Sequence, residues 1–159
     1  MDEANSRVLE SEDLGRFREE HCTDRIVFTN GCFDLLHRGH VWLLGRAREF
    51  GSCLIVGINS DDSLRRLKGA SRPLMHQDDR AFILLQLRSV DYVTVFDEDT
   101  PLETIRKLKP DVLVKGAEYE KDEIVGGDYV EALGGRVERI EMLESYSTSD
   151  LIERIKREA

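Results

Sequence analysis

Five short segments with the hydrophobic pattern of β-strands are spaced along the chain. Four are mostly apolar runs rich in β-branched residues, and the last alternates charged and apolar side chains; they cover residues 26–28, 53–58, 92–96, 112–114 and 136–140. Runs of this length bounded by turn residues are typical of strands that are covered on both faces. The pattern therefore predicts a largely buried sheet.

Apolar residues recur at helical spacing between these segments. The segment 41–50 places its apolar residues on one side and ends before Gly51, a common helix stop. Further helices are expected at residues 78–88, 101–108, 129–133 and 150–157. Strands that alternate with helices predict an α/β fold with a doubly wound, five-stranded parallel sheet.

The length of the chain and its N-terminal composition bound the domain organisation. The 159 residues suffice for one domain with a full core. Residues 1–24 are polar and acidic, with Leu9, Leu14 and Phe17 at the spacing of a short amphipathic helix. We expect a peripheral N-terminal extension over 1–24 and a single domain over 25–159.

Charge and cysteine content restrict the ligands, partners and cellular compartment that we expect. The formal net charge of −9 argues against a nucleic-acid or anionic-membrane partner, and no apolar run is long enough to cross a bilayer. The three cysteines cannot all pair within one chain and show no C-x-x-C spacing, which favours a cytoplasmic protein and disfavours a zinc site. Local cations can still bind a phosphorylated small molecule; the candidates are Lys68, Arg72, Arg80 and Lys115.

The segment that ends the first strand carries the clearest candidate chemistry. His37 and His40 are three residues apart at the expected start of a helix, so both imidazoles lie on one side of its first turn. A helix N-terminus favours phosphate, and Gly39 has no side chain to hold a phosphate away from the backbone. The pair indicates phosphoryl chemistry, although a metal pair or two surface histidines would share this spacing.

Other polar clusters also follow strands. They are 59–62 and 115–119, and a further cluster at 145–149 precedes the last helix. Ligands of doubly wound sheets bind beyond the carboxyl ends of the strands, so these clusters are expected to meet in one site. Asp61 fits a helix N-cap as well as a ligand contact, and Asp34 fits a turn cap as well as an outer contact to a metal.

Several of these segments resemble a known enzyme family. His37-Arg-Gly-His40 matches the H-x-G-H signature of the cytidylyltransferase-like nucleotidyltransferases, and the segments 30–34 and 146–149 resemble its lead-in and its second signature. The segments 68–73 and 114–119 resemble those of the D-glycero-β-D-manno-heptose 1-phosphate adenylyltransferases, which make ADP-heptose for the lipopolysaccharide inner core. The resemblance implies a Rossmann-like nucleotidyltransferase fold and a stand-alone enzyme without the sugar kinase domain of many relatives.

The resemblance implies roles for individual residues. The enzyme would transfer AMP from ATP to heptose 1-phosphate and release pyrophosphate, with Mg²⁺ carried by ATP and no protein metal ligand assigned. The expected catalytic residues are His37, His40 and Lys115. Expected nucleotide-binding residues are Thr29, Asn30, Gly31, Phe33, Asp34, Gly39, Ser147, Thr148 and Ser149. Expected substrate-binding residues are Asn59, Asp61, Lys68, Arg72, Glu118 and Tyr119.

Alternatives remain open on the sequence alone. A cytidylyltransferase acting on a polyol phosphate such as glycerol 3-phosphate would use the same histidines, and a non-catalytic nucleotide-sensing module could share the fold. Ala117-Glu118 replaces a Gly-Asp pair of many relatives, and the anomer of the heptose phosphate stays undetermined. The segment 88–93 resembles a dimer-interface segment of relatives, so we expect a homodimer or a dimer of dimers.

Overall fold

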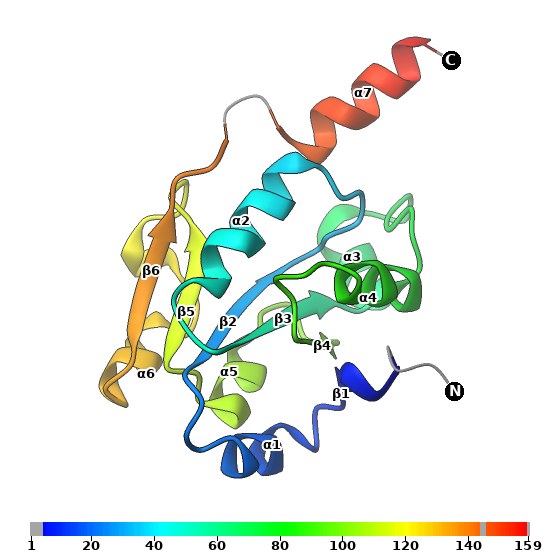
Figure 1. The fold of residues 1–159 in the computed structure, drawn as a ribbon. Helices are drawn as coiled ribbons and strands as arrows, with labels where there is room; N and C mark the ends of the chain where they lie inside the picture. The colour runs from blue at the N-terminus through cyan, green and yellow to red at the C-terminus, as the bar shows by residue number, and fades with distance from the viewer. Residues whose placement is uncertain (1–4, 144–145, 159) are drawn as a thin grey trace.

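The protein is an α/β domain in which helices cover both faces of one sheet (Figure 1). The computed structural model describes residues 5–143 and 146–158. The strands are β1 (Val8–Leu9), β2 (Ile26–Gly31), β3 (Cys53–Asn59), β4 (Tyr92–Phe96), β5 (Val112–Gly116) and β6 (Arg136–Ile140). The helices are η1 (Asn5–Arg7), α1 (Leu14–Glu20), α2 (Arg38–Arg48), α3 (Asp61–Lys68), α4 (Gln77–Leu85), α5 (Leu102–Leu108), η2 (Lys121–Glu123), α6 (Gly127–Ala132) and α7 (Thr148–Glu158).

The sheet is parallel throughout and has the strand order β1-β4-β3-β2-β5-β6. The five predicted strands are confirmed, but the prediction of a five-stranded sheet is wrong because β1 adds a sixth strand. Val8 pairs with Val93 and Leu9 pairs with Thr94 at the edge of β4. Two residues are too few to show the alternation by which a strand is recognised in a sequence.

Alternate residues of the central strands enter two separate hydrophobic cores. Val27, Leu54 and Val112 pack with α2 and α4 on one face of the sheet. Their neighbours along the strands pack with α1, α5 and α6 on the other face. This alternation is the two-residue period of a strand, and it explains why the central runs are apolar at every position.

The N-terminal segment belongs to the packed body of the domain. Leu14 is fully buried and Phe17 is 7% exposed, both against the core formed by α5 and α6. Arg18 donates to both carboxylate oxygens of Asp111, at 2.9 and 3.1 Å. Arg7 donates to the backbone oxygens of Leu85 and Val90. These contacts make α1 and β1 structural elements of the domain.

The packing of the single chain alters the expected subunit interface. An interface built on residues 88–93 needs exposed side chains, yet Val90 and Val93 are 2% and 0% exposed within a single chain. Both side chains pack in the core that includes α2 and α4. Arg88 is exposed, and Ser89, Asp91 and Tyr92 are partly exposed.

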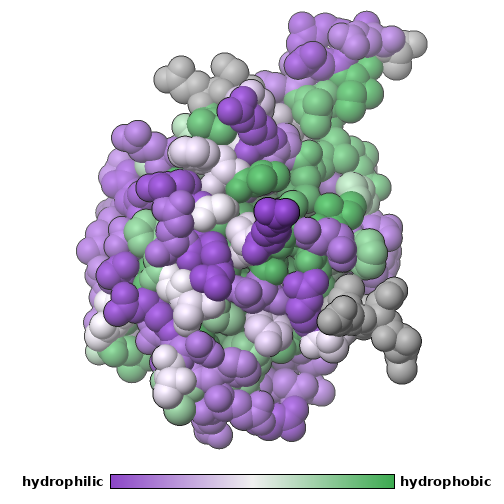
Figure 2. Space-filling model, viewed as in Figure 1, coloured by the Kyte–Doolittle hydropathy of each residue, from purple (hydrophilic) through white to green (hydrophobic). Residues whose placement is uncertain are grey.

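Helix α7 projects from the domain at the end of the chain (Figure 1). The sequence predicts that Leu151, Ile152 and Ile155 form its buried side, and this is wrong for the single chain because α7 has no buried residue and Ile155 is 55% exposed. Figure 2 shows a hydrophilic upper side and a hydrophobic lower side on this helix. Among the described residues, no helix has both the length and the apolar character to cross a bilayer.

We expect Leu14→Ala to lower the free energy of unfolding by about 2–5 kcal/mol, because it removes a fully buried side chain and leaves a cavity between α1 and the sheet. Urea denaturation followed by circular dichroism measures the change. The matched control is Leu133→Ala at a side chain that is 56% exposed. Equal, small effects of both substitutions would show that α1 is not part of the cooperative core.

Candidate active site

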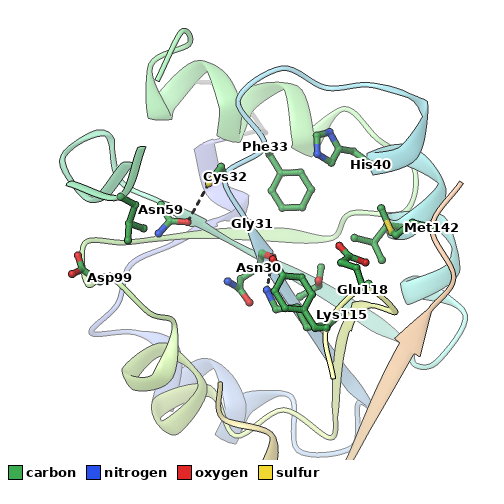
Figure 3. Close-up of a pocket in the computed structure, with 15 residues that line it drawn as sticks. Asn30, Gly31, Cys32, Phe33, His40, Asn59, Asp99, Lys115, Glu118 and Met142 are labelled. Atoms are coloured by element: carbon green, nitrogen blue, oxygen red, sulfur yellow. Dashed lines mark hydrogen bonds between the residues drawn. The ribbon is translucent and has the colours of Figure 1, made fainter. Parts of the chain in front are cut away.

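A pocket of about 300 Å³ opens where β2 and β5 end (Figure 3). These two strands are neighbours in the sheet, although β3 and β4 lie between them in the sequence. The chain therefore reverses its direction of strand addition at β2, and such a switch point is where doubly wound folds bind ligands. The pocket is lined by Thr29, Asn30, Gly31, Cys32, Phe33, His40, Leu43, Asn59, Leu67, Asp99, Lys115, Gly116, Glu118, Tyr119 and Met142.

Most of this lining belongs to segments that the sequence singles out. Nine predicted site residues meet here: Thr29, Asn30, Gly31, Phe33, His40, Asn59, Lys115, Glu118 and Tyr119. Sequence reasoning missed Cys32, Leu43, Leu67, Asp99, Gly116 and Met142. The signal for Asp99 and Met142 was their position just after β4 and β6, the same rule that identified the other clusters.

The two signature histidines stack on each other at the start of α2. Their ring centroids are 3.8 Å apart with an interplanar angle of 22°. His37 is the N-cap of the helix, and its Nδ1 accepts the backbone N–H of Gly39 at 3.1 Å. A neutral imidazole that accepts at Nδ1 carries its proton at Nε2. His37 therefore presents an N–H donor away from the helix.

Both histidines are held in the neutral form. Burial lowers the pKa of His40 to about 4, and the neighbouring His37 lowers it further in the same direction. Burial also lowers the pKa of His37. The Nδ1 atom of His40 is buried and has no hydrogen-bond partner among the described residues. The pair is a set of neutral donors whose charge would rise only beside an anion.

A second hollow, of about 180 Å³, lies between the starts of α2 and α7. It is lined by His37, Arg38, Tyr146, Ser147, Asp150, Leu151 and Arg154. Because His37 stacks on His40 of the first pocket, the histidine pair stands between the two hollows. Two arginines in its wall suit an anionic ligand. Arg38 and Arg154 were not predicted as site residues.

Residues 147–149 fix the start of α7 beside this hollow. The Ser147 hydroxyl accepts the backbone N–H of Asp150 at 3.0 Å, and Thr148 Oγ1 donates to the Leu35 carbonyl at 3.5 Å. Ser149 is exposed and lines neither hollow. Gly39 is needed here, since a Cβ at this position would lie 3.0 Å from the His37 ring and 3.2 Å from Cβ of Tyr146.

Lys115 is a partly buried cation in the wall of the first pocket. Its Nζ donates to the Asn30 carbonyl at 3.1 Å and lies 5.4 Å from the centroid of the Tyr119 ring. Among the described residues no carboxylate comes within 4.0 Å of this nitrogen. Burial lowers the pKa of Lys115 to about 8. A partly buried lysine without a carboxylate partner is suited to pair with an anionic ligand.

Asp34 lies outside the pocket and holds a neighbouring loop. Its side chain is 1% exposed and accepts hydrogen bonds from Nε of Arg72 at 2.7 Å and from the backbone N–H groups of Leu74 and Met75, both at 2.9 Å. Burial raises the pKa of Asp34, but these hydrogen bonds outweigh it and hold the pKa below its usual value. Asp34 and Arg72 thus form an ion pair with each other.

Asp61 is also turned away from the pocket. Its carboxylate pairs with Arg80 at 2.8 Å and with His76 at 3.1 Å, and the Arg80 side chain is fully buried. The N-cap of α3 is Ser60, whose hydroxyl accepts the backbone N–H of Ser63. Lys68 is exposed at the end of α3 and does not line either hollow.

Carboxylates, histidines and thiols do not gather into a metal site in the described part of the chain. No group of three or more of these residues is placed to hold a metal ion there. All three cysteines are free: Cys22 is exposed, Cys32 is partly exposed and Cys53 is buried.

The histidine pair at the start of α2 and the parallel sheet define a known class of protein. The cytidylyltransferase-like family model matches residues 28–154, which include both hollows and the whole of α2. The chain belongs to the cytidylyltransferase-like family.

Curated relatives narrow the comparison. Bifunctional protein HldE of Syntrophotalea carbinolica is 58% identical over 130 residues, which cover 82% of this chain and 26% of that protein. Bifunctional protein HldE of Helicobacter pylori is 49% identical over 157 residues, covering 99% of this chain and 33% of that protein. The chain spans between about a quarter and a third of the length of these relatives.

Solved structures share the fold. The lipopolysaccharide core biosynthesis protein of Thermoplasma volcanium superposes with a TM-score of 0.62 at 25% identity, over 78% of this chain and 99% of that one. The pantoate-β-alanine ligase of Francisella tularensis, solved with an ATP analogue and β-alanine, superposes with a TM-score of 0.57 at 12% identity over 94% of this chain and 76% of that one. The second likeness shows the fold alone.

We expect His40 to titrate near pH 4 in the free protein, because its ring is buried beside His37. The pKa in the unfolded chain is about 6.5, so the unfolded state takes up the proton first and the free energy of unfolding falls as the pH is lowered from about 6.5 towards 4. Histidine NMR titration measures the midpoint. In His37→Ala the midpoint should rise but stay below 6.5, and a midpoint near 6.5 in the native protein would contradict the buried, neutral pair.

Proposed function

We propose that the protein transfers AMP from ATP to D-glycero-β-D-manno-heptose 1-phosphate and releases pyrophosphate. The observation that carries this proposal is the stacked pair of neutral histidines between two hollows, one with a partly buried lysine and the other with two arginines. A reaction between two phosphorylated substrates needs such a boundary, with cationic groups on each side. The similarity to HldE proteins and to a lipopolysaccharide core biosynthesis protein supports the choice of substrate.

The nucleotide would extend across the histidine pair. Its planar base would pack against Phe33 and Met142, which lie on the His40 side of the first pocket (Figure 3), and Leu43 lines the same pocket. The β- and γ-phosphates would enter the second hollow, where Arg38 and Arg154 supply positive charge. The α-phosphate then lies at the histidines, which donate hydrogen bonds to its oxygens and to the leaving group.

The acceptor would occupy the other end of the first pocket. Lys115, which lines this pocket, would bind its phosphate group. Asn59 is one of the predicted sugar contacts; its Nδ2 already donates to Ser63 at 3.0 Å, and its Oδ1 lies 4.0 Å from the Cys32 thiol. Glu118 and Tyr119 follow β5 and line the same pocket.

The chemical step is one displacement at phosphorus. An anionic oxygen of the sugar phosphate attacks the α-phosphorus of ATP, and a new P–O bond forms. The bond from the α-phosphorus to the oxygen that bridges to the β-phosphorus breaks, and its electron pair leaves with pyrophosphate. The attacking oxygen carries no proton, so no general base is needed. His37 and His40 stabilise the negative charge that moves to the leaving group.

Mg²⁺ enters this scheme as part of the MgATP substrate. It prefers phosphate oxygens and water to a cage of protein ligands. The two arginines and His37 of the second hollow would complement the remaining charge of the triphosphate.

The test is a pyrophosphate-release assay with Mg²⁺ and ATP or CTP, using both anomers of heptose 1-phosphate and glycerol 3-phosphate as acceptors. Release with ATP and the β-anomer is expected. We expect His40→Ala to lower kcat by about a hundred- to a thousandfold, because it removes a donor to the developing charge. His21→Ala, which lies outside both hollows, is the matched control.

Each contrary outcome has a definite meaning. Release with CTP and glycerol 3-phosphate would replace the heptose substrate by a polyol phosphate, and binding of ATP without release would identify a nucleotide sensor. If His40→Ala keeps its fold by circular dichroism and more than about a tenth of the native rate, the histidine role is wrong.

Lys115 should make turnover depend on pH. Its pKa of about 8 means that the free protein loses this charge as the pH rises through 8, whereas a bound phosphate favours the charged form. We therefore expect kcat/KM for the acceptor to fall above about pH 8. Lys115→Arg, whose charge persists to much higher pH, should flatten this limb of the profile, measured from pH 7 to 9.5. An unchanged limb in the variant would assign the titration to another group.

A further inference from the structure

A smaller side chamber of about 140 Å³ opens from the first pocket. The two share four wall residues, Asn30, Asp99, Lys115 and Tyr119. The rest of the chamber is formed by 100–101, just before α5, and by 123–125, which begin at the last residue of η2. Its volume is below the range of about 300–1,000 Å³ usual for small-molecule sites, so it extends the first pocket and is too small for a separate ligand of nucleotide size.

The polar groups of the side chamber are mostly hydrogen-bond acceptors. Asp99 and Glu123 contribute carboxylates, and Thr100 contributes a hydroxyl. Nε of Arg66 lies 3.0 Å from Oδ1 of Asp99, which leaves Oδ2 able to accept from a ligand. The side-chain Oδ1 of Asn30 is buried and has no hydrogen-bond partner among the described residues. A ligand group that donates hydrogen bonds would satisfy this wall.

The wall of the side chamber does not suit the phosphate groups or the planar base of the two substrates. Two carboxylates would repel a phosphate group, which has only negative oxygens to offer. The apolar contacts that suit a planar base lie at the other end of the first pocket, where Figure 3 shows Phe33 and Met142 away from Asp99 and Asn59. Pro101, Ile124 and Val125 give the chamber an apolar side that suits C–H groups. Hydroxyl groups on a short carbon chain match both kinds of surface.

Lys115 places this chamber next to the acceptor phosphate. It lines both the first pocket and the side chamber, and its Nζ is bonded to the backbone of Asn30, which lines both as well. A sugar whose 1-phosphate pairs with Lys115 would therefore direct its remaining carbons towards Asp99. In heptose 1-phosphate those carbons end in a hydroxylated chain beyond the ring.

We propose that the side chamber binds the terminal hydroxylated carbons of the acceptor, with Asp99 as the residue that selects a seven-carbon sugar. This inference rests on the proposed function and identifies the part of the same site that distinguishes acceptor sugars by their length. Asp99 accepts hydrogen bonds from the terminal hydroxyls and does not contact the reacting phosphates. It acts on acceptor choice and leaves the chemical step to the histidine pair.

The test compares two acceptors in the full chain. One measurement is kcat/KM for heptose 1-phosphate, and the other is the inhibition constant of β-D-mannose 1-phosphate, which lacks the last hydroxylated carbon. Asp99→Ala should lower kcat/KM about ten- to a hundredfold, the effect of one hydrogen bond to a charged group, and change the inhibition constant less than about threefold. Glu98→Ala, a neighbouring carboxylate outside both spaces, is the matched control and should change neither.

A second variant tests the space itself. Val125→Trp fills the chamber from its rim, where Val125 is 37% exposed, and should impair heptose 1-phosphate while sparing mannose 1-phosphate. Equal losses for both sugars in Asp99→Ala and Val125→Trp, with the fold intact by circular dichroism, would overturn the side-chamber assignment alone. No pyrophosphate release from the native protein with heptose 1-phosphate would overturn the proposed function, and this inference with it.

Discussion

The geometry of the site depends on two buried charged groups that tie three loops together. Arg80 donates to the Cys32 carbonyl at 2.8 Å, to the Met75 carbonyl at 3.1 Å and to the Asp61 carboxylate. Asp34 accepts three hydrogen bonds from the loop 72–75. A buried charge is tolerated only when it is paired in this way. The ends of β2 and β3 are thereby held against one loop, and this fixes the pocket floor at 32–33.

The sequence pattern predicts those parts of the fold and the site that depend only on residues close together in the chain. The runs that form β2 to β6, the helix after the histidines and the clusters at strand ends all follow from spacing and composition. It fails where the outcome depends on a distant partner. Asp34 and Asp61 read as possible ligands because nothing local shows that Arg72 and Arg80 satisfy them. Asp99 belongs to no recognisable sequence motif, and β1 is too short to show the two-residue period of a strand.

The charge state of the histidines bears on how the site handles anions. Burial lowers the pKa of both histidines, and the neighbouring His37 lowers that of His40 further, so the pair is neutral and the positive charge lies on Lys115 and on the arginines of the second hollow. In the proposed reaction those cations would attract the phosphates, while the histidines would orient them by hydrogen bonds. Electrostatic attraction and hydrogen-bond geometry are thus assigned to different residues, which lets each be altered without the other.

The covering of β4 by β1 also determines what the sheet offers to other chains. An open strand edge is a template on which a second chain can add a strand and start aggregation. Here the outer edge on one side is only the two residues of β1. The opposite edge, β6, carries Arg136, Glu138 and Arg139, whose charges oppose regular pairing. The N-terminal segment therefore shields β4 from strand-to-strand association, and a truncation that removes β1 would expose this edge.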